Sequence, residues 1–112
     1  MPSLFEKIIA REIPATFVYE DELCVAFRDI NPCAPMHLLL VPKKPLVQLS
    51  DAAPEDQALL GHLMLTATKV AAQEGLGEAY RLVINNGAAA GMSVPHLHLH
   101  LIGGRPLKWP PA

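Results

Sequence analysis

Cysteine is scarce in this chain, which has only Cys24 and Cys33 among 112 residues. Their number and spacing exclude a disulfide framework and a C-x-x-C redox pair, and two reduced thiols are typical of a cytosolic protein. The first residues carry charges such as Glu6 and Lys7, unlike a signal peptide. No apolar run approaches the ~20 residues that a membrane span needs. We therefore expect a cytoplasmic protein with no membrane partner.

An excess of positive charge is also missing. Nine basic residues stand against eleven acidic ones, so the formal net charge is −2. This balance gives no basic surface for a nucleic-acid backbone and argues against polymeric DNA or RNA as a partner. A mononucleotide remains compatible, because a few local groups can hold one phosphate. With 51% hydrophobic and 18% charged residues, the composition predicts one globular domain over residues 1–112.

The common phosphate-binding and nucleophile motifs are absent. The chain contains no G-x-x-x-x-G-K-[ST] loop, no G-x-G-x-x-G turn after a strand and no G-x-S-x-G elbow. Ser93 lies in "GMSVP" instead. The glycines are therefore expected to serve backbone turns.

The hydrophobic pattern predicts an α+β domain with a five-stranded, mainly antiparallel sheet and two helices. Ser3 and Glu6 have the spacing of a capping box at the start of the first helix. The predicted helices cover residues 4–11 and 54–74, with one helical turn at 46–49. The predicted strands cover residues 17–20, 23–28, 36–42, 80–85 and 96–103, and the first two form a hairpin.

Three of the five histidines are crowded into the segment "HLHLHL". Side chains alternate along a strand, so His96, His98 and His100 are expected on one face and the intervening leucines on the other. Like-facing neighbours stand ~6.5–7 Å apart, close enough to act on one small ligand. A solvent-facing strand would normally carry Thr, Lys or Glu at these positions. The pattern therefore indicates a functional site.

The residues alone leave metal binding and phosphate chemistry open. A His-x-His pair with His37 or His62 is a workable set of zinc ligands, but no Asp or Glu between Asn85 and Arg105 could orient them. Neutral imidazole is a nucleophile and its protonated form a donor, with a reference pKa of ~6.5. One histidine could attack phosphorus while Asn85 and Ser93 supply neutral donors.

The motif "HLHLHLI" resembles the His-φ-His-φ-His-φ-φ signature of the histidine triad superfamily, where φ is a hydrophobic residue. Further similar blocks are "IPATFVYEDE", "FRDINPCAPMHLLLVPKK", "LLGHLM", "RLVINNG" and the closing "GGRPLKWPPA". The ending is similar to the histidine triad nucleotide-binding (Hint) branch, the purine nucleoside phosphoramidases. The resemblance implies a homodimer whose two sheets join into one of ten strands, a purine nucleotide (AMP or GMP) site, and no cofactor or metal.

The resemblance also implies a role for each matching residue. His98 would be the nucleophile that takes the nucleotidyl group, His100 would contact phosphate oxygens, and His96 would support the site. His37 matches the fourth histidine of the motif, which orients or helps the nucleophile. Ser93 matches a serine that hydrogen-bonds toward the leaving nitrogen.

The nucleotide contacts follow from the same resemblance. Asn85 matches a donor on the phosphate side, and Asp29 matches the carboxylate that binds the ribose hydroxyls. Trp109 lies in an extended tail, residues 103–112, which is expected to reach the partner's site and contact substrate. The wall of the purine pocket is matched by Leu4, Phe5, Ile8, Phe27 and Ile30.

Departures from the family pattern fall on the loop that faces the leaving group. Met92, Pro95 and Asn86 replace a frequent glutamine, aromatic residue and acidic residue. The implied leaving-group preference is therefore open. Three other functions are also compatible with the sequence: a dinucleoside polyphosphate hydrolase, a nucleotide-binding scaffold with incidental hydrolysis, and a zinc protein.

Overall fold

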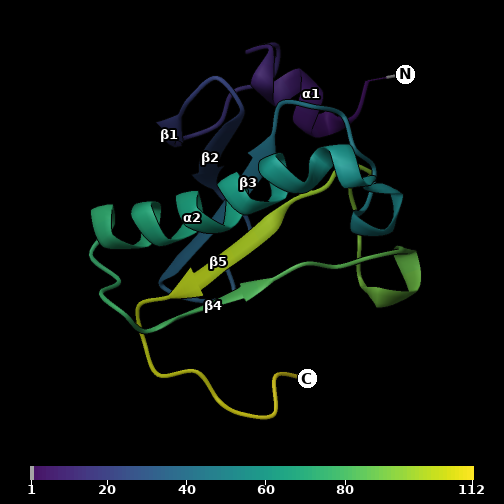
Figure 1. The fold of residues 1–112 in the computed structure, drawn as a ribbon. Helices are drawn as coiled ribbons and strands as arrows, with labels where there is room; N and C mark the ends of the chain where they lie inside the picture. The colour runs from purple at the N-terminus through teal and green to yellow at the C-terminus, as the bar shows by residue number, and fades with distance from the viewer. Residues whose placement is uncertain (1) are drawn as a thin grey trace.

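The computed structural model describes residues 2–112 and contains a five-stranded antiparallel sheet with two α-helices (Figure 1). The strand order is β1-β2-β3-β5-β4, with every neighbouring pair antiparallel. This confirms the predicted fold class. The helices are α1 (Leu4–Ile9) and α2 (Gln57–Gln73), and the strands are β1 (Phe17–Glu20), β2 (Cys24–Arg28), β3 (Met36–Pro42), β4 (Tyr80–Val83) and β5 (Leu99–Gly103).

Helix α2 covers one face of the sheet (Figure 1). Its side chains Leu63, Ala67 and Val70 are buried against leucines of β3 and β5. The leucines of the histidine segment, Leu97, Leu99 and Leu101, all belong to this core. Fully burying one such side chain contributes roughly 1.5–3 kcal/mol, so this face supplies much of the stability. No helix among residues 2–112 is long and apolar enough to cross a membrane.

Helix α1 packs on the opposite face. Phe5 and Ile8 are buried against odd-numbered residues of β2 and β3, among them Phe27 and Leu39. The rings of Phe5 and Phe27 meet edge to face, with their centroids 5.6 Å apart. The long helix α2 therefore covers one face of the sheet, and the six-residue helix α1 covers the part of the other face formed by β2 and β3.

Strand register brings polar residues together beneath α1. Side chains alternate along a strand, so Asp29, after β2, and His37, on β3, point to the same face as Phe27 and Leu39. On β5, His100 stands directly opposite Leu39. The Asp29 N–H donates to the His37 carbonyl at 3.0 Å, which continues the ladder past the end of β2. This face of the sheet thus carries imidazole and carboxylate groups next to the apolar side chains of Phe27 and Leu39.

The predicted fifth strand, residues 96–103, is too long at its start. Strand β5 begins at Leu99, so His96 and His98 precede it. Opposite them, Pro42 has no N–H, and its carbonyl accepts a hydrogen bond from the His96 ring at 2.8 Å. The ladder therefore stops, although the alternation of histidines and leucines continues through the segment.

Other boundaries also differ from the prediction. Helix α1 ends at Ile9 instead of residue 11, because Arg11 adopts a left-handed conformation with φ of 65°. Residues 54–56 form a 3₁₀ turn before α2, and the helical turn predicted at 46–49 lies at Leu49–Asp51. Strand β4 ends at Val83, because its pairing with β5 ends there.

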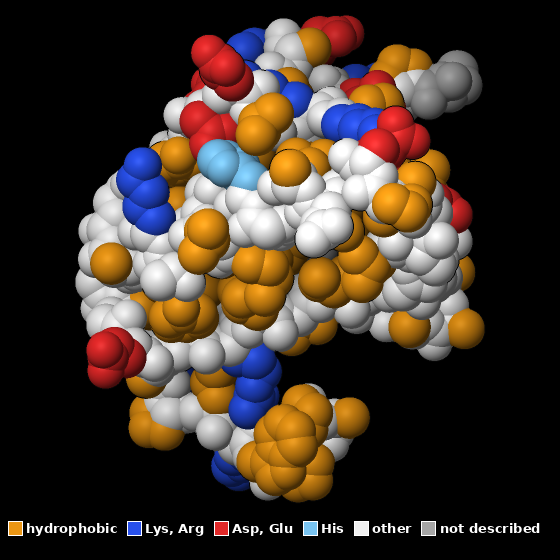
Figure 2. All heavy atoms as spheres, viewed as in Figure 1, with side chains coloured by type: hydrophobic (Ala, Val, Ile, Leu, Met, Phe, Trp, Pro, Cys, Tyr) orange, Lys and Arg blue, Asp and Glu red, His pale blue; other side chains and the backbone are white. Residues whose placement is uncertain are grey.

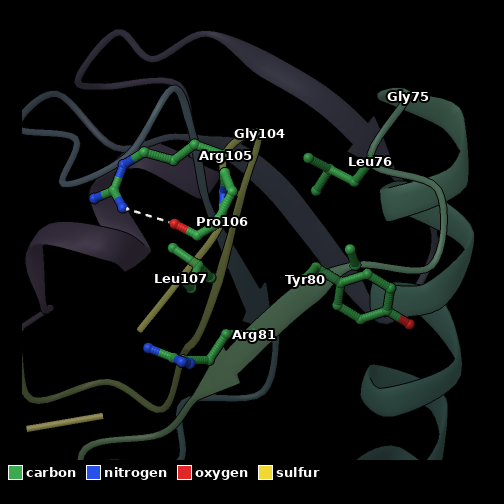
Figure 3. A pocket seen from close by; sticks show the side chains of 9 residues that line it. Gly75, Leu76, Tyr80, Arg81, Gly104, Arg105, Pro106 and Leu107 are labelled. Atoms are coloured by element: carbon green, nitrogen blue, oxygen red, sulfur yellow. Dashed lines mark hydrogen bonds between the residues drawn. The ribbon is translucent and has the colours of Figure 1, made fainter. Parts of the chain in front are cut away.

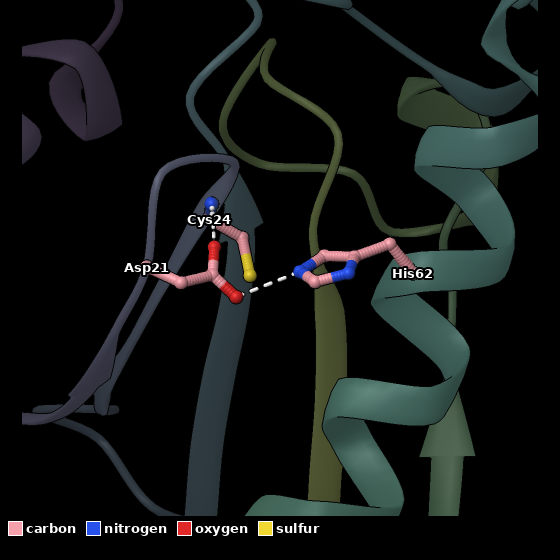
Figure 4. Close-up of side chains that lie close together, drawn as sticks. All are labelled: Asp21, Cys24 and His62. Carbon is pink, nitrogen blue, oxygen red and sulfur yellow. Dashed lines mark hydrogen bonds and ion pairs between the residues drawn. The ribbon is translucent and has the colours of Figure 1, made fainter.

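Asp21 joins the β1–β2 hairpin to α2 (Figure 4). One carboxylate oxygen accepts the N–H groups of Leu23 and Cys24, and the other accepts Tyr19 Oη–H at 2.8 Å and His62 Nε2–H at 2.7 Å. Partial burial alone would raise the pKa of this carboxyl, but the four hydrogen bonds hold its pKa well below the usual range. His62, which the sequence left as a candidate zinc ligand, is thus part of a structural contact.

Asp21→Asn is expected to lower the free energy of unfolding by about 2 kcal/mol at pH 7, because an amide removes two of the four acceptor positions. A carboxyl with a lowered folded-state pKa stabilises the fold above its unfolded pKa of ~4 and loses this effect as pH falls. Urea unfolding should therefore show the difference from wild type shrinking below about pH 4. Glu22→Gln, at the neighbouring exposed carboxyl, is the control. A pH-independent difference would contradict this account.

Candidate functional site

A cavity of about 260 Å³ lies between α1, the loop after β2 and the segment before β5. Its wall is largely apolar, and its polar groups include Asp29, Ser93, His98 and His100. An apolar slot with a few convergent polar groups is the usual form of a small-molecule site. The predicted pocket residues that line this cavity are Leu4, Phe5, Ile8, Phe27, Asp29, Ile30, Ser93, His98 and His100.

His98 presents one ring nitrogen to this cavity. Its Nδ1 lies 2.7 Å from the His96 carbonyl oxygen, which can only accept, so Nδ1 carries the hydrogen. A neutral imidazole then has a lone pair on Nε2, and Nε2 has no hydrogen-bond partner among residues 2–112. Burial lowers the pKa of His98, and the bond to the His96 carbonyl opposes this only in part. The ring is therefore neutral at pH 7, and the lone pair on Nε2 is chemically able to act as a nucleophile or to accept a hydrogen bond.

His100 has the opposite tautomer. The Cys33 N–H donates to His37 Nδ1 at 3.1 Å, so the hydrogen of a neutral His37 lies on Nε2. His37 Nε2–H then donates to His100 Nδ1 at 2.9 Å. The hydrogen of His100 is consequently on Nε2, where it is available to an acceptor such as a phosphate oxygen. Burial, and then the rings of His98 and His37, lower the pKa of His100 to about 4.

His96 does not line the cavity. Its ring is 1% exposed, Nε2 donates to the Pro42 carbonyl, and Nδ1 lies 3.1 Å from Ser3 Oγ. This histidine therefore pins the segment before β5 to β3 and α1. A polar face in solvent, the simplest structural reading of the triad, is wrong, because both His96 and His98 are buried.

Asp29 and Ser93 lie at the cavity from different loops. One oxygen of Asp29 accepts the Asn31 N–H at 2.8 Å, and the other lies 3.4 Å from His37 Nε2. A carboxylate does therefore stand beside the histidines, although none is near them in the sequence. Ser93 is exposed on the loop just before the triad.

Two predicted site residues lie elsewhere in the single chain. Asn85 Nδ2 donates to the Ala90 carbonyl at 2.8 Å, so its amide closes its own loop and does not line the cavity. Trp109 is 80% exposed in the C-terminal tail, which curls beneath β4 (Figure 1). Neither residue can contact a ligand in this cavity without rearrangement or a second chain.

A larger cavity, of about 650 Å³, lies between β4, the turn after α2 and the start of the tail (Figure 3). Its charged residues are Arg81 and Arg105, and their side chains donate to the carbonyls of Lys108, Pro106 and Cys33. No histidine, cysteine or carboxylate lines it. Its guanidinium groups hold the tail in place, and the hydroxyl of its one phenol, Tyr80, lies 3.1 Å from Thr68 Oγ1.

The residues beside the cavity do not fit a metal ion. Asp29, His37 and His100 place potential ligand atoms within 4.8 Å of one another, and the O, N, N set suits zinc. However, His37 Nδ1 already accepts the Cys33 N–H, so the Nε2 that would bind metal carries the hydrogen. Metal-bound histidines usually donate their other N–H to an acceptor. Here the group that faces His37 Nδ1 is the Cys33 N–H, which is itself a donor and cannot accept a hydrogen from the ring.

A second group, Asp21, Cys24 and His62, also brings potential ligand atoms within 4.8 Å (Figure 4). Burial and the Asp21 charge raise the pKa of the Cys24 thiol to about 12, which disfavours a thiolate. Both oxygens of Asp21 are occupied by hydrogen-bond donors. This group fits a structural contact rather than a metal centre.

Sequence reasoning missed three groups that hydrogen-bond to the rings of His96 and His37. They are the hydroxyl of Ser3, the N–H of Cys33 and the carbonyl of Pro42. Two of them are backbone atoms, which leave no mark in the sequence. Ser3 carried only the signal of a helix cap, and its contact with His96 spans 93 positions.

Comparisons with known proteins agree on one family. The family described as HIT domain matches residues 10–107. An uncharacterized HIT-like protein of Synechocystis sp. is 66% identical over 109 residues, covering 97% of this chain and 96% of the relative. A 14 kDa zinc-binding protein of Zea mays is 52% identical, covering 98% and 88%. The crystal structure of a HIT family hydrolase from Legionella pneumophila superposes with a TM-score of 0.96 at 49% identity, covering 99% and 100% of the two chains.

We expect His98 and His100 to be neutral at pH 7, with the hydrogen on Nδ1 of His98 and Nε2 of His100. Long-range ¹H–¹⁵N NMR of the imidazoles measures both. Because the pKa values of both rings are lowered in the folded state, the unfolded chain binds protons first as the pH drops. The free energy of unfolding should therefore decrease as the pH is lowered from about 6.5 to about 4. A His100 ring that titrates near 6.5 would contradict this network.

Proposed function

The chain belongs to the HIT domain family, and from this premise we propose that it is a purine nucleoside phosphoramidase. It hydrolyses the P–N bond of adenosine or guanosine 5′-phosphoramidates to the nucleoside monophosphate and an amine. The observation that carries this proposal is the free Nε2 of His98 in the cavity, beside the Nε2–H of His100. The hydrolase named among the similar structures supports the reaction class.

The reaction proceeds in two displacements. His98 Nε2 attacks phosphorus, a new N–P bond forms, and the bond to the amine breaks as the amine takes up a proton from solvent water, relayed by the exposed Ser93 hydroxyl. The ring becomes a substituted imidazolium whose Nδ1–H still donates to the His96 carbonyl. This hydrogen bond strengthens as positive charge develops on the ring. Water then attacks phosphorus and gives a proton back to solvent, the histidyl N–P bond breaks with its electron pair returning to Nε2, and neutral His98 and the monophosphate are released. His100 Nε2–H donates to a phosphate oxygen in both steps.

The roles proposed for other residues follow from where they lie. Ser93, on the cavity rim, directs a proton toward the leaving nitrogen, and His37 orients His100 through their hydrogen bond. Asp29 accepts the ribose hydroxyls. The purine lies against the wall formed by Leu4, Phe5, Ile8, Phe27 and Ile30. Asn85 reaches a phosphate oxygen only if its amide leaves the Ala90 carbonyl.

Leaving-group choice depends on the loop before the triad, where Met92 and Pro95 replace residues common in the family. Asn86 accepts the Ser50 N–H at 2.8 Å and is therefore engaged with another loop. We propose that this rim prefers small or apolar amines, because Met92 and Pro95 add no hydrogen-bond donor and only the weakly accepting thioether of Met92 beside Ser93.

His98→Ala is expected to lower turnover of an adenosine 5′-phosphoramidate at least roughly a thousandfold, because the nucleophile is lost. AMP affinity should stay within a few-fold, since the apolar wall and Asp29 remain. Release of AMP and isothermal titration measure the two effects, and intact-mass analysis of quenched wild type looks for the nucleotidyl adduct. His62→Gln, on the other face of the sheet, is the control. Full activity of His98→Ala would rule out this role.

We propose further that the chain, a single domain, acts as a homodimer through the edge of β4. The strand order leaves this edge without a partner strand in the single chain. Beside it lies an apolar cavity of about 200 Å³, lined in part by Leu49, Met64 and Ile84. Hydrophobic side chains gather over α2 and below it, and a hollow separates the body from the tail (Figure 2). In a dimer, two sheets join into ten strands, and the tail with Trp109 reaches the partner's cavity.

Wild type is expected to have twice the mass of one chain in light scattering, and Met64→Glu to shift it toward the monomer at micromolar concentration. The reason is that a buried carboxylate without a partner opposes association. Leu23→Glu makes the same change at another exposed hydrophobic residue, on the hairpin, and should remain dimeric. A monomeric wild type would contradict the proposal.

Three other functions are separated by direct assays. A dinucleoside polyphosphate hydrolase would cleave a diadenosine polyphosphate faster than a phosphoramidate. A scaffold would keep its role in the cell after His98→Ala. Zinc binding is favoured by the name of the Zea mays relative, and a zinc enzyme would lose activity to a chelator. We expect full activity after chelation, because no proposed step needs a metal.

The free thiols Cys24 and Cys33 support a cytoplasmic location.

A further inference from the structure

Ser3 has a hydrogen bond that its role as a helix cap does not require. Its hydroxyl accepts the Glu6 N–H at 3.1 Å, and the Glu6 carboxylate accepts the Ser3 N–H at 3.0 Å, which confirms the predicted capping box. The same hydroxyl lies 3.1 Å from His96 Nδ1. Both side chains are buried, with Ser3 9% exposed. The first turn of the chain is therefore joined to the first histidine of the triad.

The direction of this bond follows from the other nitrogen of the ring. The Pro42 carbonyl can only accept, so His96 Nε2 carries the hydrogen and Nδ1 of the neutral ring carries a lone pair. The hydrogen between Ser3 and His96 must then come from the Ser3 hydroxyl. This hydroxyl donates to His96 and accepts from Glu6, and both nitrogens of His96 have a partner.

His96 passes this constraint to His98 through its backbone. Its carbonyl holds His98 Nδ1–H at 2.7 Å and so keeps the lone pair on Nε2. Phe5, two residues after Ser3, packs its ring edge to face against His98, with centroids 4.9 Å apart and planes at 88°. The N-terminus of α1 thus fixes both the carbonyl and the aromatic wall beside the reacting ring.

We propose that Ser3 is a positioning residue of the active site, which holds His96 as a neutral ring of one tautomer and thereby orients His98. This inference rests on the proposed function for its effect on turnover. Ser3 itself touches no reacting atom. A protonated His96 would place a positive charge two residues from His98 and oppose formation of the imidazolium-like intermediate.

Three variants separate the cap from the donor. Ser3→Thr keeps a hydroxyl that can cap the helix and donate to His96. Ser3→Asp keeps a good cap, but a carboxylate has no hydrogen to donate, so it favours the doubly protonated His96. Glu6→Ala is the matched control, because it removes the reciprocal bond of the cap and leaves the Ser3 hydroxyl in place.

With an adenosine 5′-phosphoramidate as substrate, Ser3→Thr and Glu6→Ala should stay within about twofold of wild type in kcat/KM. Ser3→Asp should lose on the order of tenfold or more, mainly in kcat, because small misplacements of a nucleophile are costly. AMP affinity should stay within about threefold, and a nuclear Overhauser contact between Phe5 and His98 checks that α1 is docked.

Imidazole ¹⁵N NMR tests the contact without reference to activity. At pH 7, wild type and Ser3→Thr should show His96 protonated on Nε2 alone, and Ser3→Asp should show both nitrogens protonated. The proposal is overturned if Ser3→Asp leaves the state of His96 and the rate unchanged, or if Glu6→Ala loses as much activity as Ser3→Asp. If wild type cleaves no phosphoramidate, the proposed function fails, and the NMR result alone decides the role of Ser3.

Discussion

A neutral imidazole carries one hydrogen, and this constraint decides what each histidine of the site can do. Backbone groups of fixed polarity assign that hydrogen: the Cys33 N–H excludes it from His37 Nδ1, and the His96 carbonyl holds it on His98 Nδ1. The result is a lone pair on His98 and a donor on His100, side by side with ring centroids 5.0 Å apart. The same assignment is what makes the set of His37, His100 and Asp29 unsuitable for zinc.

The two faces of the sheet divide stability from chemistry. Under α2, leucines and alanines form a core that includes the three leucines of the histidine segment, Leu97, Leu99 and Leu101. Under α1, the other half meets phenylalanines and a cavity. Burial on this second face keeps His98 and His100 neutral, at the cost of stability in acid. A helix of six residues is too short to be stable alone, so α1 depends on its contacts with the sheet and His96.

Much of this arrangement could be predicted from the sequence. The alternation in "HLHLHL", the hairpin and the capping box are local patterns with local physical causes, and all three are present. The start of β5 could not be predicted, because it depends on Pro42, 54 positions away from His96. The direction of the Asn85 amide and the second bond of Ser3 depend on which atoms face each other in three dimensions. Asp29 was expected at the ribose, but its place beside His37 could not be predicted for the same reason, since only the β2–β3 register brings the two together.

The segment "NPCAP" offers the hydrogen that sets His37 from a main-chain atom, and prolines at 32 and 35 have none to give. The contact at position 33 therefore depends on the backbone N–H and not on the cysteine side chain. Every amino acid except proline has the N–H that this bond needs, so proline is the one substitution that removes the donor. The side chain at position 33 can therefore change without touching the contact that orients His37, because that contact belongs to the peptide backbone.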